Sequence, residues 1–270
     1  MEILTALLVV AVVGLIAGVL LAVASHFFAV PENETVKAVR ECLPGANCGA
    51  CGFAGCDAYA EAVANGKAEA NACIPGGADV AAQLSEILGV SVSAGAKKVA
   101  FVNCTGDCNA VNSTVIYDGM QNCSAAKMIY GGPSSCKFGC IGCGDCMNVC
   151  PVDAILICED LARIDPKACI GCGKCVKTCP KGVISLVPQT IAAAVACSNT
   201  EKGAVARKNC KNACIGCKKC EKICPEGAIK VVDNLAVIDY EKCADCGICT
   251  AQCPTGCLKL VDMVNGKIGY

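Results

Sequence analysis

The sequence lacks tryptophan, has one histidine, and contains only 4% aromatic residues among its 270 positions. A large aromatic core is therefore excluded, and small domains held together partly by something other than hydrophobic burial are expected. No G-x-G-x-x-G opens a predicted helix, and no Walker loop is present. The chain thus offers no sequence basis for a dinucleotide-binding site of its own.

Cysteine, by contrast, is abundant, with 29 residues. In a short secreted chain this content would indicate a disulfide framework. The spacing argues against it, because four runs each place four cysteines within eleven residues, too close for the usual geometry of S–S bonds. The runs are CIGCGDCMNVCP at 140–151, CIGCGKCVKTCP at 169–180, CIGCKKCEKICP at 214–225 and CADCGICTAQCP at 243–254.

The spacing C-x2-C-x2-C-x3-C-P is that of bacterial ferredoxins, where three cysteines hold one [4Fe–4S] cube and the fourth holds the other cube of a pair. The runs recur after 29 residues within a pair and after 74 residues between pairs, which predicts two tandem two-cluster units. Exchange of the fourth ligand gives Cys140, Cys143, Cys146 with Cys179; Cys169, Cys172, Cys175 with Cys150; Cys214, Cys217, Cys220 with Cys253; and Cys243, Cys246, Cys249 with Cys224. Zinc is the alternative, but it usually takes two separated cysteine pairs.

The segments 154–165 and 228–239 each lie between two paired runs and are rich in β-branched residues around an Asp- or Asn-containing turn. Each predicts a hairpin of two strands. Every two-cluster unit is therefore expected to have a small α+β fold.

An earlier cysteine set has the form C-x2-C-x4-C-x16-C, which by spacing alone suits zinc or an iron–sulfur cluster. The chain between its third and fourth members predicts a helix capped by Asp57 and stopped at 65–66. A second helix is predicted over about 79–88, ending at Gly89. The four cysteines are Cys48, Cys51, Cys56 and Cys73.

The segment 99–139 carries four further cysteines outside the ferredoxin runs, and a sixth cluster is predicted there. Its proposed ligands are Cys104, Cys108, Cys123 and Cys136. Two alternatives stay open: these are partly structural thiols, or Cys136 competes with Cys140 or Cys143 for ligation. Six sites leave five cysteines, interpreted as small buried residues: Cys42, Cys158, Cys197, Cys210 and Cys257.

Residues 3–25 contain no charge and are long enough to cross a bilayer as a helix. A signal peptide fits poorly, because no Lys or Arg precedes the run and the run exceeds the usual apolar region. An uncleaved single-pass anchor in the cytoplasmic membrane is predicted. The iron–sulfur part is expected on the cytoplasmic side, because cluster assembly needs reduced thiols.

Residues 101–270 carry 18 Lys plus Arg against 15 Asp plus Glu, and seven of the basic residues lie within 202–222. The simpler interpretation is that they offset the negative charge of the clusters on a solvated face. The sharper one is a docking patch for an acidic soluble ferredoxin. The residues predicted for that patch are Lys208, Lys211, Lys218 and Lys219.

An N-terminal apolar helix, then LPGANCGACGFAGCDAYAEAVANG at 43–66 with Cys73, and then ferredoxin repeats resembles the B subunit of Rnf complexes, in its longer anaerobe type. The resemblance implies that the module around Cys48 holds a [4Fe–4S] cluster. It also implies a membrane complex that oxidises reduced ferredoxin, reduces NAD⁺ and pumps Na⁺ or H⁺. The chain has no flavin attachment motif, so its own chemistry is expected to be electron transfer alone. It would relay electrons from ferredoxin to the other subunits. No nucleic-acid partner is expected.

Two other classes are weighed against this one. The first is a membrane-anchored polyferredoxin of another redox complex, such as a hydrogenase. The second is an iron sensor or zinc scaffold, which the four ferredoxin runs disfavour. The predicted division of the chain is an anchor at 1–30, an N-terminal cluster module at 31–98, a Cys-rich insertion at 99–139, ferredoxin units at 140–190 and 214–262 separated by a linker at 191–213, and a tail at 263–270.

Overall fold

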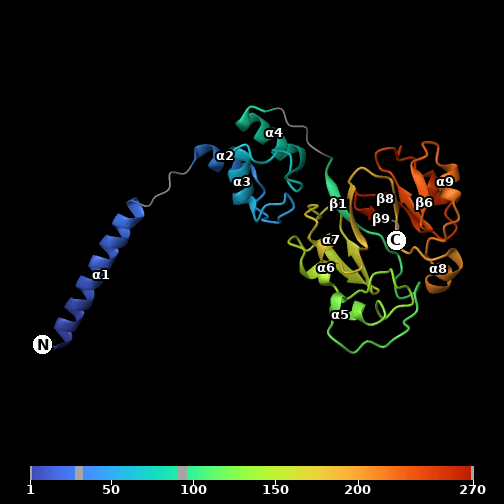
Figure 1. The fold of residues 1–270 in the computed structure, drawn as a ribbon, viewed down its shortest axis with the longest axis horizontal. Helices are drawn as coiled ribbons and strands as arrows, with labels where there is room; N and C mark the ends of the chain where they lie inside the picture. Colours follow the sequence, from blue (N-terminus) through green and yellow to red (C-terminus); the bar gives the residue numbers. More distant parts are fainter. Residues whose placement is uncertain (1, 28–32, 91–95, 269–270) are drawn as a thin grey trace.

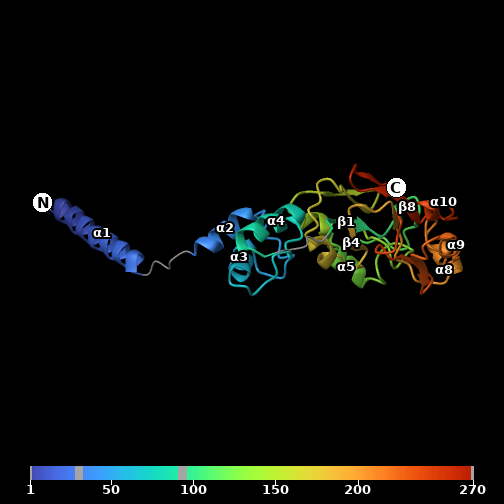
Figure 2. The same ribbon diagram turned by 90° about the horizontal axis from the view of Figure 1, so that it is seen from above.

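The computed structural model describes residues 2–27, 33–90 and 96–268. Helix α1 (Glu2–Phe27), a small helical body and a larger body of strands and short helices follow one another along the long axis of the molecule (Figures 1 and 2). The predicted boundary between residues 30 and 31 lies outside the described residues. A mixed helix and strand architecture, as predicted, is present.

The predicted transmembrane helix over 3–25 is the part of the expected fold that the structure corrects. Helix α1 covers the run. Within the described part of the chain, no helix is long and apolar enough to cross a membrane. A single N-terminal transmembrane helix is therefore not supported.

The small helical body is built from α2 (Glu34–Cys42), α3 (Cys56–Ala64) and α4 (Gly77–Leu88). Helix α2 packs against both of the others. The apolar side chains that face one another form one buried core. Its most deeply buried members are Val39, Tyr59, Ala60, Val63 and Leu84.

Both helices predicted in this body are confirmed. Helix α3 ends directly before residue 65, and α4 ends at Gly89, whose φ of 65° suits the left-handed conformation of a helix C-cap. The predicted capping role of Asp57 is wrong, because the N-cap is Gly55. The Asp57 carboxylate instead forms an ion pair with Arg40, which joins α3 to α2.

The larger body contains two similar series of short elements. In the first series they are β1 (Lys98–Val102), α5 (Cys123–Met128), α6 (Asp145–Asn148), β2 (Ile155–Cys158), β3 (Leu161–Ile164), α7 (Lys174–Thr178) and β4 (Ile184–Pro188). In the second they are β5 (Ala193–Val195), α8 (Gly203–Asn209), α9 (Lys219–Ile223), β6 (Ile229–Val232), β7 (Leu235–Ile238), α10 (Ile248–Ala251), β8 (Leu258–Asp262) and β9 (Lys267–Ile268).

Both predicted hairpins are confirmed. Strand β2 pairs with β3, and β6 pairs with β7, each as an antiparallel two-stranded sheet. The turn residues have positive φ in both hairpins, with Glu159 and Asp160 in the first and Asp233 and Asn234 in the second. Two consecutive residues with positive φ are what a tight two-residue turn between twisted strands requires.

Each ferredoxin unit is completed by a strand that precedes it in the sequence. Strand β1 pairs antiparallel with β4, from Lys98 opposite Pro188 to Val102 opposite Ile184. Strand β5 pairs antiparallel with β8 in the same manner. The two units also share a core, because Val261 and Met263 from the second unit lie in one cluster with residues of the first.

Candidate iron–sulfur centres

All 29 cysteines lie among the described residues, and all are free thiols. Burial is the main cause that raises the pKa of several predicted ligands, to about 12 for Cys146 and to about 11 for Cys175 and Cys220. Neighbouring thiolates add to the effect at Cys146 and Cys175. A buried thiolate is unfavourable without a compensating cation, so these positions suit metal-bound sulfur, and binding iron there would release protons.

The cleanest of the predicted sets surrounds a cavity of about 330 Å³. Two of its sulfurs come from the loop before α7, the third comes from Cys175 within α7, and the fourth comes from the end of the preceding ferredoxin run. The sulfur of Cys169 accepts hydrogen bonds from the N–H groups of Ala100 and Gly171, both at 3.4 Å. All four predicted members line the cavity: Cys150, Cys169, Cys172 and Cys175.

A second cavity, of about 340 Å³, lies at the other predicted site of this unit. Its lining includes the predicted ligands Cys140, Cys146 and Cys179, and also Cys123, which starts α5. Burial, and then the charge and hydrogen bond of Cys123, raise the pKa of Cys143 to about 11. Cys123 therefore lies beside the predicted ligand Cys143.

In the second unit a cavity of about 320 Å³ is lined by Cys214, Cys217, Cys220 and Cys253, the complete predicted set. Cys257 also lines this cavity, with its sulfur 3.5 Å from that of Cys253. The Cys257 thiol stays protonated, since its hydrogen bonds to Cys214 and Cys253 raise its pKa. These bonds lower the pKa of Cys253 to about 4 and that of Cys214 to about 6.

The last ferredoxin set lies at the outer end of the second unit. Burial, and then the charges of its neighbours, raise the pKa of Cys249, and these neighbours include Cys243, Cys246 and Cys224. The four predicted members are therefore close together. The N–H of Ala228 donates to the Cys224 sulfur at 3.3 Å, and Cys246 is exposed.

The four predicted ligands of the N-terminal helical body also lie close together. Burial is the main cause that raises the pKa of Cys73, and the charges of Cys56, Cys48 and Cys51 add to it. The side-chain oxygen of Asn47 accepts the backbone N–H of Cys56 at 2.8 Å, which fixes the loop at the start of α3. All four predicted ligands of this module are thus held around one point.

The four cysteines predicted for the sixth cluster do not lie together. Cys108 is exposed, and Cys123 lies beside Cys143 at another site. Cys104 and Cys136 line a cavity of about 350 Å³ between the two ferredoxin units, which we call the seam cavity.

Two cysteines interpreted as ordinary buried residues, Cys197 and Cys210, complete the lining of sulfurs around the seam cavity, together with Cys140 at its edge. Sequence reasoning missed both, because Cys197 has no cysteine at short spacing and Cys210 precedes a ferredoxin run that already has its four cysteines. One signal was present: Cys136 and Cys210 are separated by the same 74 residues as the ferredoxin runs. The other three of the five remaining cysteines are half-buried Cys42, exposed Cys158 and buried Cys257.

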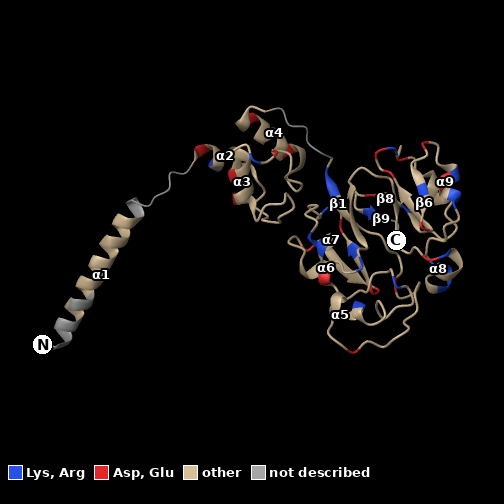
Figure 3. Ribbon diagram, in the orientation of Figure 1, with Lys and Arg blue, Asp and Glu red and all other residues tan. Residues whose placement is uncertain are grey.

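The predicted docking lysines are exposed and lie on and around α8 and α9 (Figure 3). Lys218 and Lys219 also line the cavity between Cys214 and Cys253. The Lys211 ammonium donates to the carbonyl oxygen of Asn109 at 3.0 Å, which holds it against the first unit. Positive charge is therefore placed directly over one of the predicted centres.

The residues at these sites fit iron–sulfur cubes. In the described part of the chain, no three His, Cys, Asp or Glu side chains converge closely enough to hold a single metal ion. The thiols instead surround cavities of similar size, and backbone N–H groups point at several of their sulfurs. Such N–H donors stabilise the negative charge that thiolate and cluster carry.

Comparison with protein families agrees with these sites. A family described as "putative Fe-S cluster" matches residues 43–75. A family described as "4Fe-4S dicluster domain" matches 139–183 and 213–257, and a second family with the same description matches 168–229. The first of these families covers all four predicted ferredoxin runs, and the second covers those at 169–180 and 214–225.

Several curated proteins are similar over most of the chain. The B subunit of the Na⁺-translocating ferredoxin:NAD⁺ oxidoreductase complex of Acetobacterium woodii is 45% identical, over 86% of this chain and 70% of its own length. The B subunit of the proton-translocating complex of Clostridium ljungdahlii is 45% identical, over 88% and 84%. The B subunit of the ion-translocating oxidoreductase complex of Methanosarcina acetivorans is 40% identical, over 87% and 89%.

Proposed function

We propose a function from one premise: this chain belongs to the family of B subunits of ion-translocating ferredoxin:NAD⁺ oxidoreductase (Rnf) complexes. It is a subunit of a translocating oxidoreductase, and its 4Fe-4S dicluster domains make it an electron-transfer subunit. The proposal is that it accepts electrons from reduced ferredoxin and passes them to other subunits of the complex, which reduce NAD⁺.

The observation that carries the proposal is the series of cysteine-lined cavities. Two of them are lined by complete predicted ligand sets, and at the one around Cys169 backbone N–H groups donate to the ligand sulfur. A [4Fe–4S] cube, when bound, supplies a carrier for one electron. We assign five cubes to the ligand sets predicted for the N-terminal module and for the two ferredoxin units. The chain holds them in place and sets their potentials through hydrogen bonds to sulfur.

Contacts between neighbouring sites support a continuous route along the chain. Burial, with an added contribution from the nearby charge of Cys48, raises the pKa of Cys172, so the N-terminal module lies next to the first ferredoxin unit. Within that unit, burial and the charges of other thiols raise the pKa of Cys146, and the charge of Cys175 adds to this effect. The two centres of the first unit are therefore close together. Electrons that enter the second unit would therefore leave through the N-terminal module.

Exposure supports the second unit as the entrance. Cys217 and Cys246 are the exposed members of its two ligand sets. Lys218 and Lys219 flank Cys217, where they attract an acidic partner. The ammonium groups therefore mark the place where a soluble ferredoxin would bring its own cluster closest. We place this part of the chain in the cytoplasm, because assembly of clusters on these cysteines needs reduced thiols.

The test uses the purified complex with the full chain, mixed anaerobically with reduced bacterial ferredoxin in a stopped-flow instrument. We expect the double variant Lys218→Glu/Lys219→Glu to take up electrons about tenfold more slowly at low ionic strength. The difference should vanish near 1 M salt, where the Debye length is about 3 Å.

The matched control is Lys67→Glu/Lys97→Glu, which makes the same change in net charge at two exposed lysines away from α8 and α9. The control should retain the unmodified rate. Equal rates for both double variants at low salt would reject docking at this patch. No uptake by the unmodified complex, with clusters that dithionite still reduces, would reject ferredoxin as the donor.

A further inference from the structure

The seam cavity is lined by cysteines from both halves of the larger body. Its volume of about 350 Å³ is close to those of the three cavities at the predicted ferredoxin sites, about 320 to 340 Å³. Among the described residues that line it there is no carboxylate and no imidazole, so sulfur is the only strong metal donor. The four cysteines that belong to neither ferredoxin unit's ligand sets are Cys104, Cys136, Cys197 and Cys210.

Two of these cysteines are repeats of one another. Cys136 and Cys210 are 74 residues apart, the period that relates the two ferredoxin units. Each lies four residues before the first ligand of its unit, Cys140 or Cys214. Both are buried, with 7% and 6% of their surface exposed. The repeat therefore brings one buried thiol from each unit to the seam cavity.

The other two cysteines are related in the same way by structure. Cys104 lies two residues after β1, and Cys197 lies two residues after β5. Each sulfur accepts the N–H of the residue two positions on, at 3.4 Å in both cases. Each also accepts the N–H of its unit's first ligand, Cys140 at 3.5 Å or Cys214 at 3.3 Å. Two N–H donors per sulfur is also what Cys169 has at a ferredoxin site.

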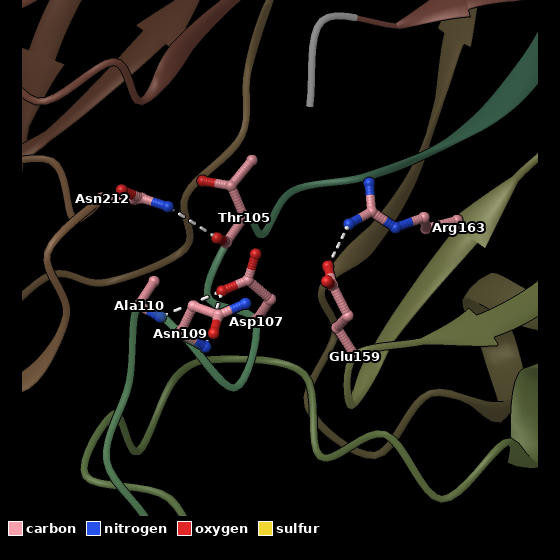
Figure 4. Close-up of polar contacts among 7 residues, drawn as sticks. All are labelled: Thr105, Asp107, Asn109, Ala110, Glu159, Arg163 and Asn212. Atoms are coloured by element: carbon pink, nitrogen blue, oxygen red, sulfur yellow. Dashed lines mark hydrogen bonds and ion pairs between the residues drawn. The ribbon is translucent and has the colours of Figure 1, made fainter.

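Reciprocal hydrogen bonds hold the two halves together beside the cavity. The Thr105 hydroxyl donates to the carbonyl oxygen of Ala196 at 3.4 Å, and the Ser198 hydroxyl donates to that of Asn103 at 2.8 Å. In each pair, the residue after one cysteine reaches the residue before the other. The Asn212 amide adds a bond to the Thr105 carbonyl at 2.9 Å (Figure 4). The seam is thus an approximate two-fold arrangement, with its sulfurs fixed by both halves.

We propose that Cys104, Cys136, Cys197 and Cys210 ligate a [4Fe–4S] cube in the seam cavity, two ligands coming from each half. The choice of cofactor rests on the proposed function, whereas the sulfur set and the cavity are features of the structure. The Asn199 side-chain amide lies 3.7 Å from the Cys136 sulfur and supplies a further donor. This assignment replaces Cys108 and Cys123 by Cys197 and Cys210 in the ligand set.

The seam site would join the two ferredoxin units. The N–H bonds from Cys140 and Cys214 attach its sulfurs directly to the first ligand of one centre in each unit. Without a carrier at this position, the route between the units would cross the apolar and thiol side chains that line the cavity. A sixth cube there makes the route from the second unit to the N-terminal module continuous.

The test counts iron and acid-labile sulfide in the full chain, purified anaerobically with its clusters. Six cubes give about 24 iron atoms per chain. The double variant Cys197→Ala/Cys210→Ala should hold about 20, with the visible absorbance near 400 nm lower by about one sixth. The matched control Cys108→Ala/Cys158→Ala removes two exposed thiols and should retain about 24.

The remaining 20 iron atoms in the seam variant show that the protein still folds around its other sites. Unchanged iron in that variant, or loss of four iron atoms in the control, would overturn the assignment. A stoichiometric zinc ion in the unmodified chain, lost in the seam variant, would also overturn it. A chain with about 24 iron atoms that takes no electrons from ferredoxin would count against the proposed function while supporting the seam site.

Discussion

Replacing Gly171 by alanine should destabilise the first ferredoxin unit where its cluster loop packs against β1. Gly171 lies between two cluster ligands with a φ of +67°. A Cβ atom there would lie 2.2 Å from the carbonyl oxygen of Lys98 and 3.5 Å from the Cγ2 atom of Ile74. The carbonyl belongs to β1, which is paired with β4, so it cannot move aside without disturbing the sheet.

The expected cost has two parts. A non-glycine residue in the left-handed region costs about 1–2 kcal/mol, and forcing an atom into a filled position costs about 1–3 kcal/mol more. Gly182 offers a matched control, because its φ is +63° and nothing lies within 4 Å of an added Cβ. Gly182→Ala should therefore incur only the first part, and the difference between the variants isolates the steric clash with Lys98.

The assay is urea unfolding of the full chain under anaerobic conditions, followed by loss of cluster absorbance. Because the bound clusters prevent a simple two-state analysis, midpoints are compared rather than extrapolated free energies. With a slope near 3 kcal/mol/M, Gly171→Ala should unfold at about 0.3–1 M lower urea than Gly182→Ala. Equal midpoints for the two variants would refute the steric argument.

Two other predictions concern the clusters themselves. Cys257→Val removes the S–H donor beside the Cys253 sulfur and should lower the potential of that centre by an amount on the order of tens of millivolts; Cys257→Ser, which keeps a donor, should restore most of it in an EPR-monitored redox titration. Removing iron with a chelator should abolish the strand signal of the ferredoxin units in circular dichroism, because ligand cysteines make up much of their cores; a native spectrum without iron would contradict this.

Local features of the chain were predictable from the sequence. The hairpins over 154–165 and 228–239 follow from β-branched runs around a polar turn, and the structure confirms both. Helix α4 likewise ends at the predicted Gly89, whose positive φ a side chain would oppose. Signals of this kind depend on a few adjacent residues, so one sequence suffices to find them.

Long-range pairing was not predictable in the same way. Nothing in the residues of β1 or β5 indicates which strand completes which sheet, because pairing partners are chosen by packing across the whole unit. The seam cysteines were missed for the same reason: Cys197 has no neighbouring cysteine, and only the fold brings it to Cys136. Asp57 was predicted to cap a helix, but tertiary packing gave it Arg40 as a partner instead.

The early position of β1 and β5 limits how the protein can be divided for expression. A fragment that starts at the first ferredoxin cysteine, Cys140, would lack β1 and leave the edge of β4 without its partner. An open strand edge with free backbone donors and acceptors pairs readily with other chains. Fragments cut at the limits of the ferredoxin motifs should therefore aggregate. A fragment that begins before Lys98 retains β1, which pairs with the edge of β4.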